Sequence, residues 1–354
     1  MTTKINNEHK KLNVPNLRFP EFQGKWITYK IKDVLSIGNG RDYKHLNNGG
    51  IPVFGTGGYM TSVDECLYDG ETTFIGRKGS INKPFYYNGK FWTVDTLFYT
   101  HSFNGITPKF TYCLFQTINW LKYNEASGVP SLSKDTTRKI KIKIPGLEEQ
   151  NKIAKLMFAL DERITTQNKI IDKLQSLIKG IAQKIVHSNK TNVRLSECVE
   201  CSSSTLQESD VCEHGAYPVY GANGIVGYLD NYNTKGEAVY IIKDGSGVGT
   251  VSYVTGKCSA TGTLNTLQAK EGYSLQYLYY LLKVFNFEPY KTGMAIPHIY
   301  FKDYGKAKFF CPSYIEQLQY AQSLSAIDSK LLVEKNILTS LSMQKQYLLR
   351  QMFI

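Results

Sequence analysis

The sequence has none of the features that send a chain into or across a membrane. No stretch approaches roughly 18 consecutive apolar residues, the length that a membrane-spanning helix needs. The opening residues, MTTKINNEHKKLNVPNLRF, contain no apolar core of the signal-peptide type. The seven cysteines fit a reducing compartment. We therefore expect the protein in the cytoplasm.

Signatures of common catalytic and metal sites are also missing. There is no Gly-Lys-Ser/Thr phosphate loop of a motor ATPase and no convincing cluster of carboxylates and lysine for a nuclease. Cys198, Cys201, Cys212 and His214 loosely imitate zinc ligands, but the second pair is wrongly spaced for a zinc finger. We interpret Cys198 as a small buried hydrophobic residue.

Positive charge, by contrast, is in excess. The chain has 42 Lys and Arg against 30 Asp and Glu, a formal net charge of +12, which favours a polyanionic partner, nucleic acid first. Residues 1–146 hold 20 basic against 11 acidic residues, whereas residues 191–312 hold 10 against 11. Any nucleic-acid contact in the second stretch therefore depends on a few well-placed groups. A basic protein without such a partner remains an alternative.

The chain contains an internal repeat. PVFGTGG (52–58) returns as PVYGANG (218–224), 166 residues later. KIPGLEEQ (143–150) returns as FCPSYIEQ (310–317), 167 residues later. A unit of about 165 residues thus occurs twice, and its length is far above the roughly 20–50 residues of solenoid repeats. This pattern indicates a duplicated domain.

Each copy begins with a β-rich part. Residues rich in Gly, Tyr and Thr form short strand-like runs, which Asn, Gly and Asp turns separate. The predicted strands include residues 72–76, 91–100, 238–243 and 250–255. Short helices are expected around residues 109–123 and 275–285. This mixture predicts a domain of mixed sheet with a few short helices.

Each copy ends in a predicted long helix. Pro145-Gly146 and Pro312-Ser313 mark where these helices begin. Apolar residues then alternate in steps of four and three, which is the seam of a coiled coil. In the second copy the same pattern starts at Tyr320. The candidate seam residues are Ile153, Leu160, Ile164, Gln167, Ile171, Leu174, Leu324, Ile327, Leu331, Glu334, Leu338 and Leu341.

Polar residues interrupt both seams at corresponding positions. Gln167 in the first helix matches Glu334 in the second, and a shared polar position can set the register between partners. The two helices are expected to pair with each other, with Lys345 facing a carboxylate. A helix of about 40 residues is about 60 Å long. The alternative is an amphipathic helix packed on its own domain.

These segments resemble the specificity subunits of Type I restriction–modification enzymes. VPNLRFPEFQGKWITYKIKDV (14–34) is similar to that family's N-terminal conserved segment. Residues 127–164, which begin SGVPSLSKDTTRKI, resemble the end of a target-recognition domain followed by the central conserved helix. Residues 292–328 resemble the same element in the second copy. The resemblance covers essentially the whole chain and rests on the duplicated order of the segments.

The resemblance implies a fold and its division. It implies an α+β protein with two pseudo-repeated target-recognition domains, each a mixed β-sheet with short helices. Two long helices would separate these domains and pair as an antiparallel coiled coil. The implied segments are an N-terminal conserved segment (1–24), target-recognition domain 1 (25–146), a central conserved long helix (147–190), target-recognition domain 2 (191–312) and a C-terminal conserved long helix (313–354).

The resemblance also implies a function. The chain would be a non-catalytic subunit in which each target-recognition domain reads one half of a bipartite duplex DNA site. The long helices would set the half-site spacing and dock two methyltransferase (modification) subunits, which restriction (motor–nuclease) subunits would join. This chain would hold no cofactor and no metal. S-adenosylmethionine, ATP and Mg are expected in the partner subunits of a prokaryotic, cytoplasmic complex.

Two loops in each copy are candidates for DNA contact. The first follows a predicted strand, and in the first copy two glycines frame its cations, so that the backbone can approach DNA closely. Arg77 could grip a guanine edge or a phosphate, Lys78 and Lys83 phosphates, and Asn82 an adenine. The second loop precedes each long helix. The candidate DNA-binding residues are Tyr59, Arg77, Lys78, Ser80, Asn82, Lys83, Ser131, Ser133, Lys134, Asn223, Lys243, Ser246, His298, Tyr300 and Lys302.

Two other functions stay open. Phe54-Gly55-Thr56-Gly57-Gly58 and Asn82-Lys83-Pro84-Phe85 imperfectly resemble motifs of a catalytic DNA adenine methyltransferase, but they lie close together and the second copy keeps neither. A coiled-coil scaffold without a nucleic-acid function explains the seam but not the duplicated basic β-rich units. The glycine-rich run at 245–249 is not a dinucleotide loop in our interpretation, because a strand-like segment follows it.

Overall fold

The computed structural model describes residues 13–188 and 190–354. These residues form two compact units. Unit 1 consists of the described residues up to 167 together with 337–354, and unit 2 consists of the described residues within 168–336. Residues 1–12 of the predicted N-terminal segment, and residue 189 of the predicted central helix segment, lie outside the described residues.

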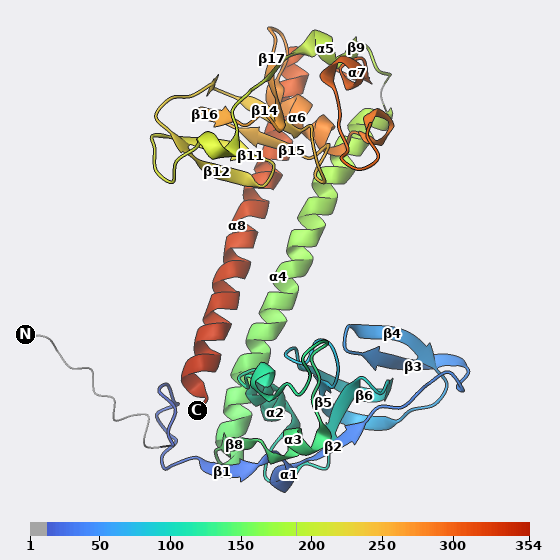
Figure 1. Ribbon diagram of the computed structural model, residues 1–354, viewed down its shortest axis with the longest axis vertical. Coiled ribbons are helices and arrows are strands. Elements are labelled where there is room, and N and C mark those ends of the chain that lie inside the picture. The colour runs from blue at the N-terminus through green and yellow to red at the C-terminus, as the bar shows by residue number, and fades with distance from the viewer. Residues whose placement is uncertain (1–12, 189) are drawn as a thin grey trace, which may run out of the picture. The chain divides into compact units, whose positions relative to one another are not determined.

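The described part of unit 1 contains a six-stranded sheet in the order β2-β7-β5-β6-β3-β4 (Figure 1). β3 and β6 pair in parallel, and the other neighbours are antiparallel. Phe74 and Phe91, on β5 and β6, are fully buried in an aromatic cluster on this sheet. The strands are β2 (Ser36–Asn39), β3 (Asn48–Gly55), β4 (Gly58–Val63), β5 (Tyr68–Gly76), β6 (Phe85–Thr93) and β7 (Leu97–His101).

Helix α2 joins this sheet to the long helices. Its Phe110 lies in one hydrophobic core with Met157 of α4 and with Phe353, just beyond the end of α8. The Thr107 side chain caps α2 by accepting a hydrogen bond from the backbone N–H of Phe110. The helices with residues in unit 1 are α1 (Ile31–Val34), α2 (Pro108–Phe115), the 3-10 helix η2 (Trp120–Tyr123), α3 (Lys134–Lys139), α4 (Leu147–Ser188) and α8 (Tyr314–Met352).

Unit 2 repeats this arrangement with one strand divided. Its described residues form two four-stranded sheets, β10-β17-β14-β15 and β12-β11-β16-β13. β15 and β16 together take the place of β6, and they are separated at Gly256, whose φ is +92°. Its strands are β10 (Val199–Ser203), β11 (Tyr217–Gly221), β12 (Gly224–Leu229), β13 (Thr234–Lys235), β14 (Ala238–Ile242), β15 (Val251–Val254), β16 (Lys257–Ala260) and β17 (Leu264–Ala269).

Helix α6 holds the place in unit 2 that α2 holds in unit 1. The Ser274 side chain caps it by accepting from the backbone N–H of Tyr277. Tyr277 and Leu278 are completely buried. The short helices of unit 2 are α5 (Leu195–Cys198), the 3-10 helices η3 (Glu208–Asp210) and η4 (Glu288–Tyr290), α6 (Leu275–Val284) and α7 (Phe301–Tyr304).

A two-stranded ribbon closes each unit beside the start of its long helix. In unit 1 β1 (Ile27–Lys30) pairs with β8 (Lys141–Ile144). In unit 2 β9 (Val193–Arg194) pairs with β18 (Lys308–Phe309). The chain passes from β8 into α4, and from β18 into α8, through the two Pro-containing joints that the sequence marks. The prolines thus stand between an extended segment and a helix, where their fixed φ is compatible with both.

A buried glutamine in the first turn of each long helix ties that helix to its sheet domain. The Gln150 amide accepts a hydrogen bond from the Thr107 N–H at 2.9 Å and donates to two backbone carbonyls. The Gln317 amide accepts from the Ser274 N–H at 2.9 Å and donates to one backbone carbonyl. Because Thr107 and Ser274 cap α2 and α6, each glutamine fixes a short helix to the start of a long one.

The glutamate before each glutamine has different partners in the two units. Glu149 is 3% exposed and accepts two hydrogen bonds from the Arg18 guanidinium, at 2.8 and 2.7 Å, and one from the Trp26 indole at 3.3 Å. Glu316 is exposed and accepts from the N–H and the hydroxyl of Ser313, at 3.1 and 2.7 Å, at the start of its own helix. One glutamate therefore anchors the N-terminal segment, and the other caps a helix.

The long helices bury one face. α4 has 42 residues and α8 has 39. The prediction that the α8 seam starts at Tyr320 is wrong: Tyr320 is 37% exposed, whereas Ala321 is 1% exposed. A helix turns once in about 3.6 residues, so the buried face drifts away from a strict seven-residue pattern. Among the candidate seam residues, Ile153, Leu160, Gln167, Ile171, Leu324, Leu331, Glu334 and Leu341 are buried, and Ile164, Leu174, Ile327 and Leu338 are half-buried.

Within unit 1 the two long helices run antiparallel. Met157 shares a core with Met352, and one turn further along α4 Asp161 forms an ion pair with Lys345. The Lys345 ammonium also donates to the Gln116 side chain at 2.8 Å. The prediction that Lys345 faces a carboxylate is confirmed. The α+β class is confirmed as well, with two mixed-sheet domains and two long helices.

One predicted strand is wrong in its extent. The run 91–100 is not continuous, because β6 ends at Thr93 and β7 begins at Leu97. The Leu97 N–H donates to the Val94 carbonyl at 3.0 Å, which closes a turn. The turn is needed because β6 and β7 pair with opposite edges of β5. Local composition could not show this reversal, since both halves of the run are equally strand-like.

One predicted helix is also divided. The helix expected around residues 109–123 consists of α2, which ends at Phe115, and η2, which begins at Trp120. The Thr117 hydroxyl donates to the Leu114 carbonyl at 2.7 Å, and the Trp120 indole donates to the Phe115 carbonyl at 2.8 Å. Side chains thus satisfy the last carbonyls of α2 in place of a further helical turn.

Several absences hold for the part of the chain that the structure describes. No helix there carries the apolar run that crossing a bilayer demands. No group of His, Cys, Asp and Glu there is arranged as a metal site, and every cysteine there is a free thiol. Cys198 is buried, with its sulfur 3.9 Å from the sulfur of Cys311.

Candidate nucleic-acid interface

The two loops predicted as DNA contacts in unit 1 lie side by side. The first loop follows β5 and the second precedes α3. The Gly79 N–H donates to the Pro130 carbonyl at 2.8 Å, and the Leu132 N–H donates to the Arg77 carbonyl at 2.8 Å. These two bonds form a short antiparallel bridge between segments that are far apart in the sequence. The structure therefore presents the two loops as one surface.

The joined loops line a cavity of about 310 Å³. Lys78 and Ser131 stand opposite each other in the bridge. The Arg77 guanidinium is held at its edge by a hydrogen bond to the Asp95 carbonyl at 3.1 Å. The predicted DNA-binding residues that line the cavity are Arg77, Lys78, Ser131, Ser133 and Lys134. Cations and hydroxyl groups, which hydrogen-bond phosphates and base edges, are thus gathered in one place.

Polar side chains brace the second loop. Asn124 accepts a hydrogen bond from the Ser131 N–H at 2.8 Å. Ser133 donates to the Glu125 carboxylate at 2.9 Å and caps α3 by accepting from the Thr136 N–H at 3.1 Å. Hydrogen bonds from Thr136 and Ser133 hold the pKa of Glu125 below its ordinary value. An ionised carboxylate therefore lies on the wall of a cavity that also holds cations.

Unit 2 repeats the same backbone arrangement. The Gly245 N–H donates to the Pro297 carbonyl at 3.0 Å, and the Ile299 N–H donates to the Lys243 carbonyl at 2.9 Å. These are the counterparts, about 167 positions later, of the two bonds that join the loops in unit 1. We call this arrangement the loop frame: in each unit, the two loops and the pair of backbone hydrogen bonds between them.

Glycine makes the loop frame possible. Gly79 and Gly245 have φ of +84° and +94°, a conformation that residues with a side chain rarely adopt. At Gly76, which ends β5, a Cβ atom would lie 2.4 Å from the Ser80 carbonyl oxygen. The predicted role of glycine around the first loop of unit 1 thus has a steric basis.

The side chains on the two loop frames differ. Where unit 1 pairs Lys78 with Ser131, unit 2 pairs Asp244 with His298. The His298 Nδ1 lies 2.6 Å from the Asp244 Oδ1, and each side chain is 37% exposed. His298 also exchanges two backbone hydrogen bonds with Thr292, at 2.9 and 2.8 Å. The same backbone thus presents a cation in one unit and a carboxylate beside an imidazole in the other.

The other predicted residues of unit 1 lie outside the cavity wall. Ser80, Asn82 and Lys83 are exposed on the continuation of the first loop, before β6. Tyr59 is exposed next to the β3–β4 turn, and its hydroxyl lies 3.1 Å from that of Ser62. These positions leave the four residues accessible, and their contact with DNA stays a prediction.

The other predicted residues of unit 2 surround its loop frame. Lys243 is half-buried and Ser246 is exposed, both directly after β14. Tyr300 and Lys302 are exposed at the start of α7, with the ammonium 5.3 Å from the ring centroid. Asn223 is exposed in the β11–β12 turn. Their contact with DNA is likewise a prediction.

Sequence reasoning missed several residues of this surface. Asn39 and Glu125 line the cavity of unit 1, although neither lies in a predicted loop. No local pattern marks them, because Asn39 is placed by the pairing of β2 with β7, and Glu125 by a hydrogen bond from its N–H to the Ser131 carbonyl at 3.0 Å. Val129 and Ile296 are exposed at the tips of the second loops. Their shared apolar character at corresponding positions was a signal that the repeat offered.

The motifs that suggested a methyltransferase have another geometry. Residues 54–58 form the turn of a hairpin, since β3 ends at Gly55 and β4 begins at Gly58. Residues 82–85 lead directly into β6. A nucleotide loop of the expected kind follows a strand and opens a helix, and neither segment opens one. These motifs therefore give no support to a cofactor site.

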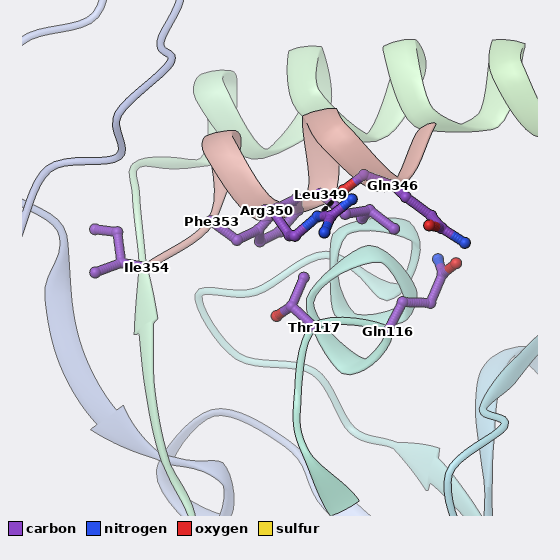
Figure 2. Close-up of a pocket in the computed structure, with 7 residues that line it drawn as sticks. All are labelled: Gln116, Thr117, Gln346, Leu349, Arg350, Phe353 and Ile354. Carbon is purple, nitrogen blue, oxygen red and sulfur yellow. Dashed lines mark hydrogen bonds between the residues drawn. The ribbon is translucent and has the colours of Figure 1, made fainter. Parts of the chain in front are cut away.

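A different cavity in unit 1 lies between the end of α2 and the C-terminal part of α8 (Figure 2). Its volume is about 530 Å³, and unit 2 has a counterpart of about 490 Å³ beside α6. In unit 1 the Arg350 side chain donates to the Gln346 carbonyl at 3.2 Å along this wall. Both cavities belong to the packing of short helices on long ones, so they are not part of the loop surface.

Comparisons with known proteins fit this arrangement. The model of the "Type I restriction modification DNA specificity domain" matches residues 23–176 and again residues 187–343. The fold is similar to the crystal structure of a Type I restriction–modification S subunit from M. genitalium, with a TM-score of 0.74 and 18% sequence identity over 96% of this chain and 99% of that one. That likeness shows the fold alone.

Three curated relatives share parts of the sequence. The Type I restriction enzyme EcoprrI specificity subunit of Escherichia coli is 27% identical over 113 residues, 32% of this chain. The putative subunit S.HindORF215P of Haemophilus influenzae is 34% identical over 82 residues, 22% of this chain. The MjaVIII specificity subunit of Methanocaldococcus jannaschii is 28% identical over 172 residues, 42% of this chain. The matched parts span 28%, 21% and 38% of the length of these relatives.

The family model matches most of the chain, and its two matches follow the duplication that the loop frames display. The chain therefore belongs to the family of Type I restriction modification DNA specificity domains, of which it carries two copies.

Proposed function

We propose that this chain is a non-catalytic DNA sequence-specificity subunit of a Type I restriction–modification complex. Each unit reads one half of a bipartite duplex DNA site with its loop frame. The proposed reading domains are residues 25–146 and 191–312, the long-helix segments are 147–190 and 313–354, and residues 1–24 form the N-terminal conserved segment. Cofactors such as S-adenosylmethionine, ATP and Mg belong to partner subunits in a prokaryotic cytoplasm.

The observation that carries this proposal is the repeated loop frame with unlike side chains. The same two backbone hydrogen bonds join the loops in both units, yet Lys78 and Ser131 are replaced by Asp244 and His298. Base pairs differ in the order of donors and acceptors along the major groove. A constant backbone with different polar groups is what two unlike half-sites require.

Charge supports contact with the DNA backbone. Lys78 and Lys83 are exposed at the first loop of unit 1, and Lys134 lies on the cavity wall. Most hydrogen bonds between proteins and DNA go to phosphates and sugars, and they set register rather than specificity. We therefore assign phosphate contacts to these lysines and base contacts to the shorter side chains between them.

The long helices support two further roles. Exposed large apolar residues lie on them, including Met343 and Tyr347 in unit 1 and Leu177 and Leu332 in unit 2. Grouped exposed apolar residues mark protein–protein contacts. We propose that these helices dock two methyltransferase (modification) subunits, which restriction (motor–nuclease) subunits join. A helix of the length of α4 is about 60 Å long, which suits a spacer between half-sites.

A domain exchange tests the proposal. Residues 25–145 are replaced by the corresponding segment of another family member, and the full-length chimera and the parent chain each select from a library of randomised duplexes. We expect the chimera to recover a bipartite sequence in which one half is new and the other half is that of the parent. Recovery of an unchanged sequence, or a change in both halves, would contradict the proposal.

Salt dependence is the control for that selection. A protein that neutralises phosphates loses affinity as a power of the salt concentration. Filter binding of the parent chain and the chimera should therefore weaken steeply and in parallel as salt is raised. Binding that does not respond to salt would indicate that the selected duplexes are held without phosphate contacts, and a scaffold function would then be favoured.

A further inference from the structure

The loop frames carry opposite polarity at one corresponding position. In unit 1 this position is Lys78, opposite Ser131, and in unit 2 it is Asp244, opposite His298. Lysine can only donate hydrogen bonds, and an ionised carboxylate can only accept them. The same two backbone hydrogen bonds join the loops beside both positions, so the contrast in polarity comes from the side chains.

The carboxylate of Asp244 is held in place. Its Oδ1 lies 2.6 Å from the His298 Nδ1, and because a carboxylate only accepts, the imidazole is the donor in this contact. His298 is itself fixed by its two-way backbone bonding with Thr292. Gly293, next in the chain, has no room for a Cβ, which would lie 2.4 Å from the Ile296 carbonyl oxygen. A tight hairpin thus positions the imidazole, and the imidazole positions the carboxylate.

The carboxylate also remains accessible. The Asp244 and His298 side chains are each 37% exposed, and a carboxylate has about four acceptor positions, of which this contact uses one. The half-buried Lys243 precedes Asp244 in the chain, and the exposed Lys302 follows His298 at the end of the second loop. An accessible acceptor flanked by cations suits a surface whose lysines meet phosphates while the acceptor meets a base.

A carboxylate at a DNA surface repels phosphates, so its partner must be a donor on a base. In the major groove these donors are the exocyclic amino groups of cytosine and adenine. We propose that Asp244, positioned by His298, reads such an amino group in the half-site of unit 2, whereas Lys78 makes the corresponding position of unit 1 a donor to phosphate. This inference rests on the proposed function, and it adds the chemical group that one half-site must present.

The first test uses selection by the full-length chain. The parent, Asp244→Ala, and the double variant Asp244→Lys/His298→Ser each select from randomised duplexes. The double variant gives unit 2 the residues of unit 1 at these positions, and the matched control, Lys78→Asp/Ser131→His, makes the reverse exchange. We expect Asp244→Ala, which removes the acceptor, to lose roughly 5- to 150-fold discrimination for cytosine or adenine at one position. The other half-site should be unchanged, which also shows that the variant is folded.

The second test needs no variant for the parent measurement. In the selected duplex, the cytosine or adenine is replaced by an analogue that lacks only the exocyclic amino group. We expect the parent chain to bind the analogue roughly 5- to 150-fold more weakly, and Asp244→Ala to bind both duplexes about equally. The base selected at this position shows whether cytosine or adenine supplies the amino group.

The outcomes of these tests distinguish a failure of this inference from a failure of the proposed function. If the parent selects no sequence, the proposed function fails and the inference fails with it. If the parent selects a bipartite sequence but Asp244→Ala selects the same one, and the analogue binds as well as the natural base, only the inference is overturned. The pair of residues would then serve to brace the hairpin.

Discussion

The two units share a backbone but not the groups that it carries. In both units a glycine of positive φ and two backbone hydrogen bonds hold the two loops of the loop frame together. On that common arrangement Lys78 stands in one unit and Asp244 in the other. A duplicated domain can therefore keep its loop geometry through backbone hydrogen bonds, which depend little on the side chains, while the polar side chains on its surface differ between the copies.

A similar contrast between the units is found around one aspartate of each long helix. Asp161 in unit 1 pairs with Lys345 of α8, and its counterpart Asp328 in unit 2 pairs with Lys283 of α6 at 3.7 Å. In each unit the lysine ammonium also lies over a tyrosine ring, at 5.8 Å in unit 1 and 5.1 Å in unit 2. The position of the ammonium is kept although different elements supply it, so the aspartate is compensated in both units.

The largest difference in stability between the units is expected when Glu149 or Glu316 is replaced. Replacing Glu149 by alanine leaves the Arg18 guanidinium, which is 13% exposed, without its carboxylate, and such a loss costs about 3–5 kcal/mol. Replacing Glu316 removes only contacts at an exposed helix start, worth about 0.5–2 kcal/mol. Urea denaturation of the full chain with each variant measures both values. Equal losses would show that the buried ion pair adds nothing beyond a helix cap.

A smaller effect is expected at the aspartates. Asp161→Asn weakens a contact with a lysine that is 13% exposed and should cost about 1–3 kcal/mol. Asp328→Asn weakens a longer and more exposed pair, 33% and 26% exposed, and should cost about 0.2–1 kcal/mol. Amide hydrogen exchange of the α2 and α6 peptides reports each unit separately. A larger loss of protection in α6 than in α2 would contradict this ranking.

The smallest change in stability is expected in the buried core of unit 2. Cys198 and Cys311, whose sulfurs lie 3.9 Å apart, correspond to Val34 and Ile144 in unit 1, which are also buried. Replacing Cys198 alone by valine, the residue at the corresponding position of unit 1, changes the side-chain volume only slightly and keeps it apolar, so it should alter the unfolding free energy by less than about 1.5 kcal/mol. Thermal denaturation under reducing conditions measures it. A loss above that value would show that the thiol of Cys198 has a packing role beside Cys311 that an aliphatic side chain cannot fill.

Much of the fold could be predicted because its signals are local. Prolines at the joints and the apolar periodicity after them predicted both long helices, and the repeat predicted two similar sheet domains. The predicted strand at residues 91–100 was wrong because a reversal of the chain depends on which strands pair, and pairing leaves no local mark. The start of the α8 seam was wrong because helical drift favours Ala321 over Tyr320 as the buried residue.

The candidate site was predictable only in part. The first loop of unit 1 was marked by its glycines and cations, and the second by its small polar residues. Asn39 and Glu125 were missed because strand and helix packing bring them to the cavity from other parts of the chain. Asp244 was missed as well, because the sequence does not show that this single aspartate, in a nearly neutral segment, contacts His298.

The sequence alone determined the duplication, the two long helices and the places of the candidate DNA-contact loops, because these depend on periodicity and on residues close together in the chain. The tertiary structure decided which loops join, which lysine meets each aspartate and which polar pair each unit exposes. The reason is the separation of the interacting residues along the chain. A backbone bond between distant segments costs chain entropy that only the packed domain can offset, so such a pair exists only once the whole unit has folded.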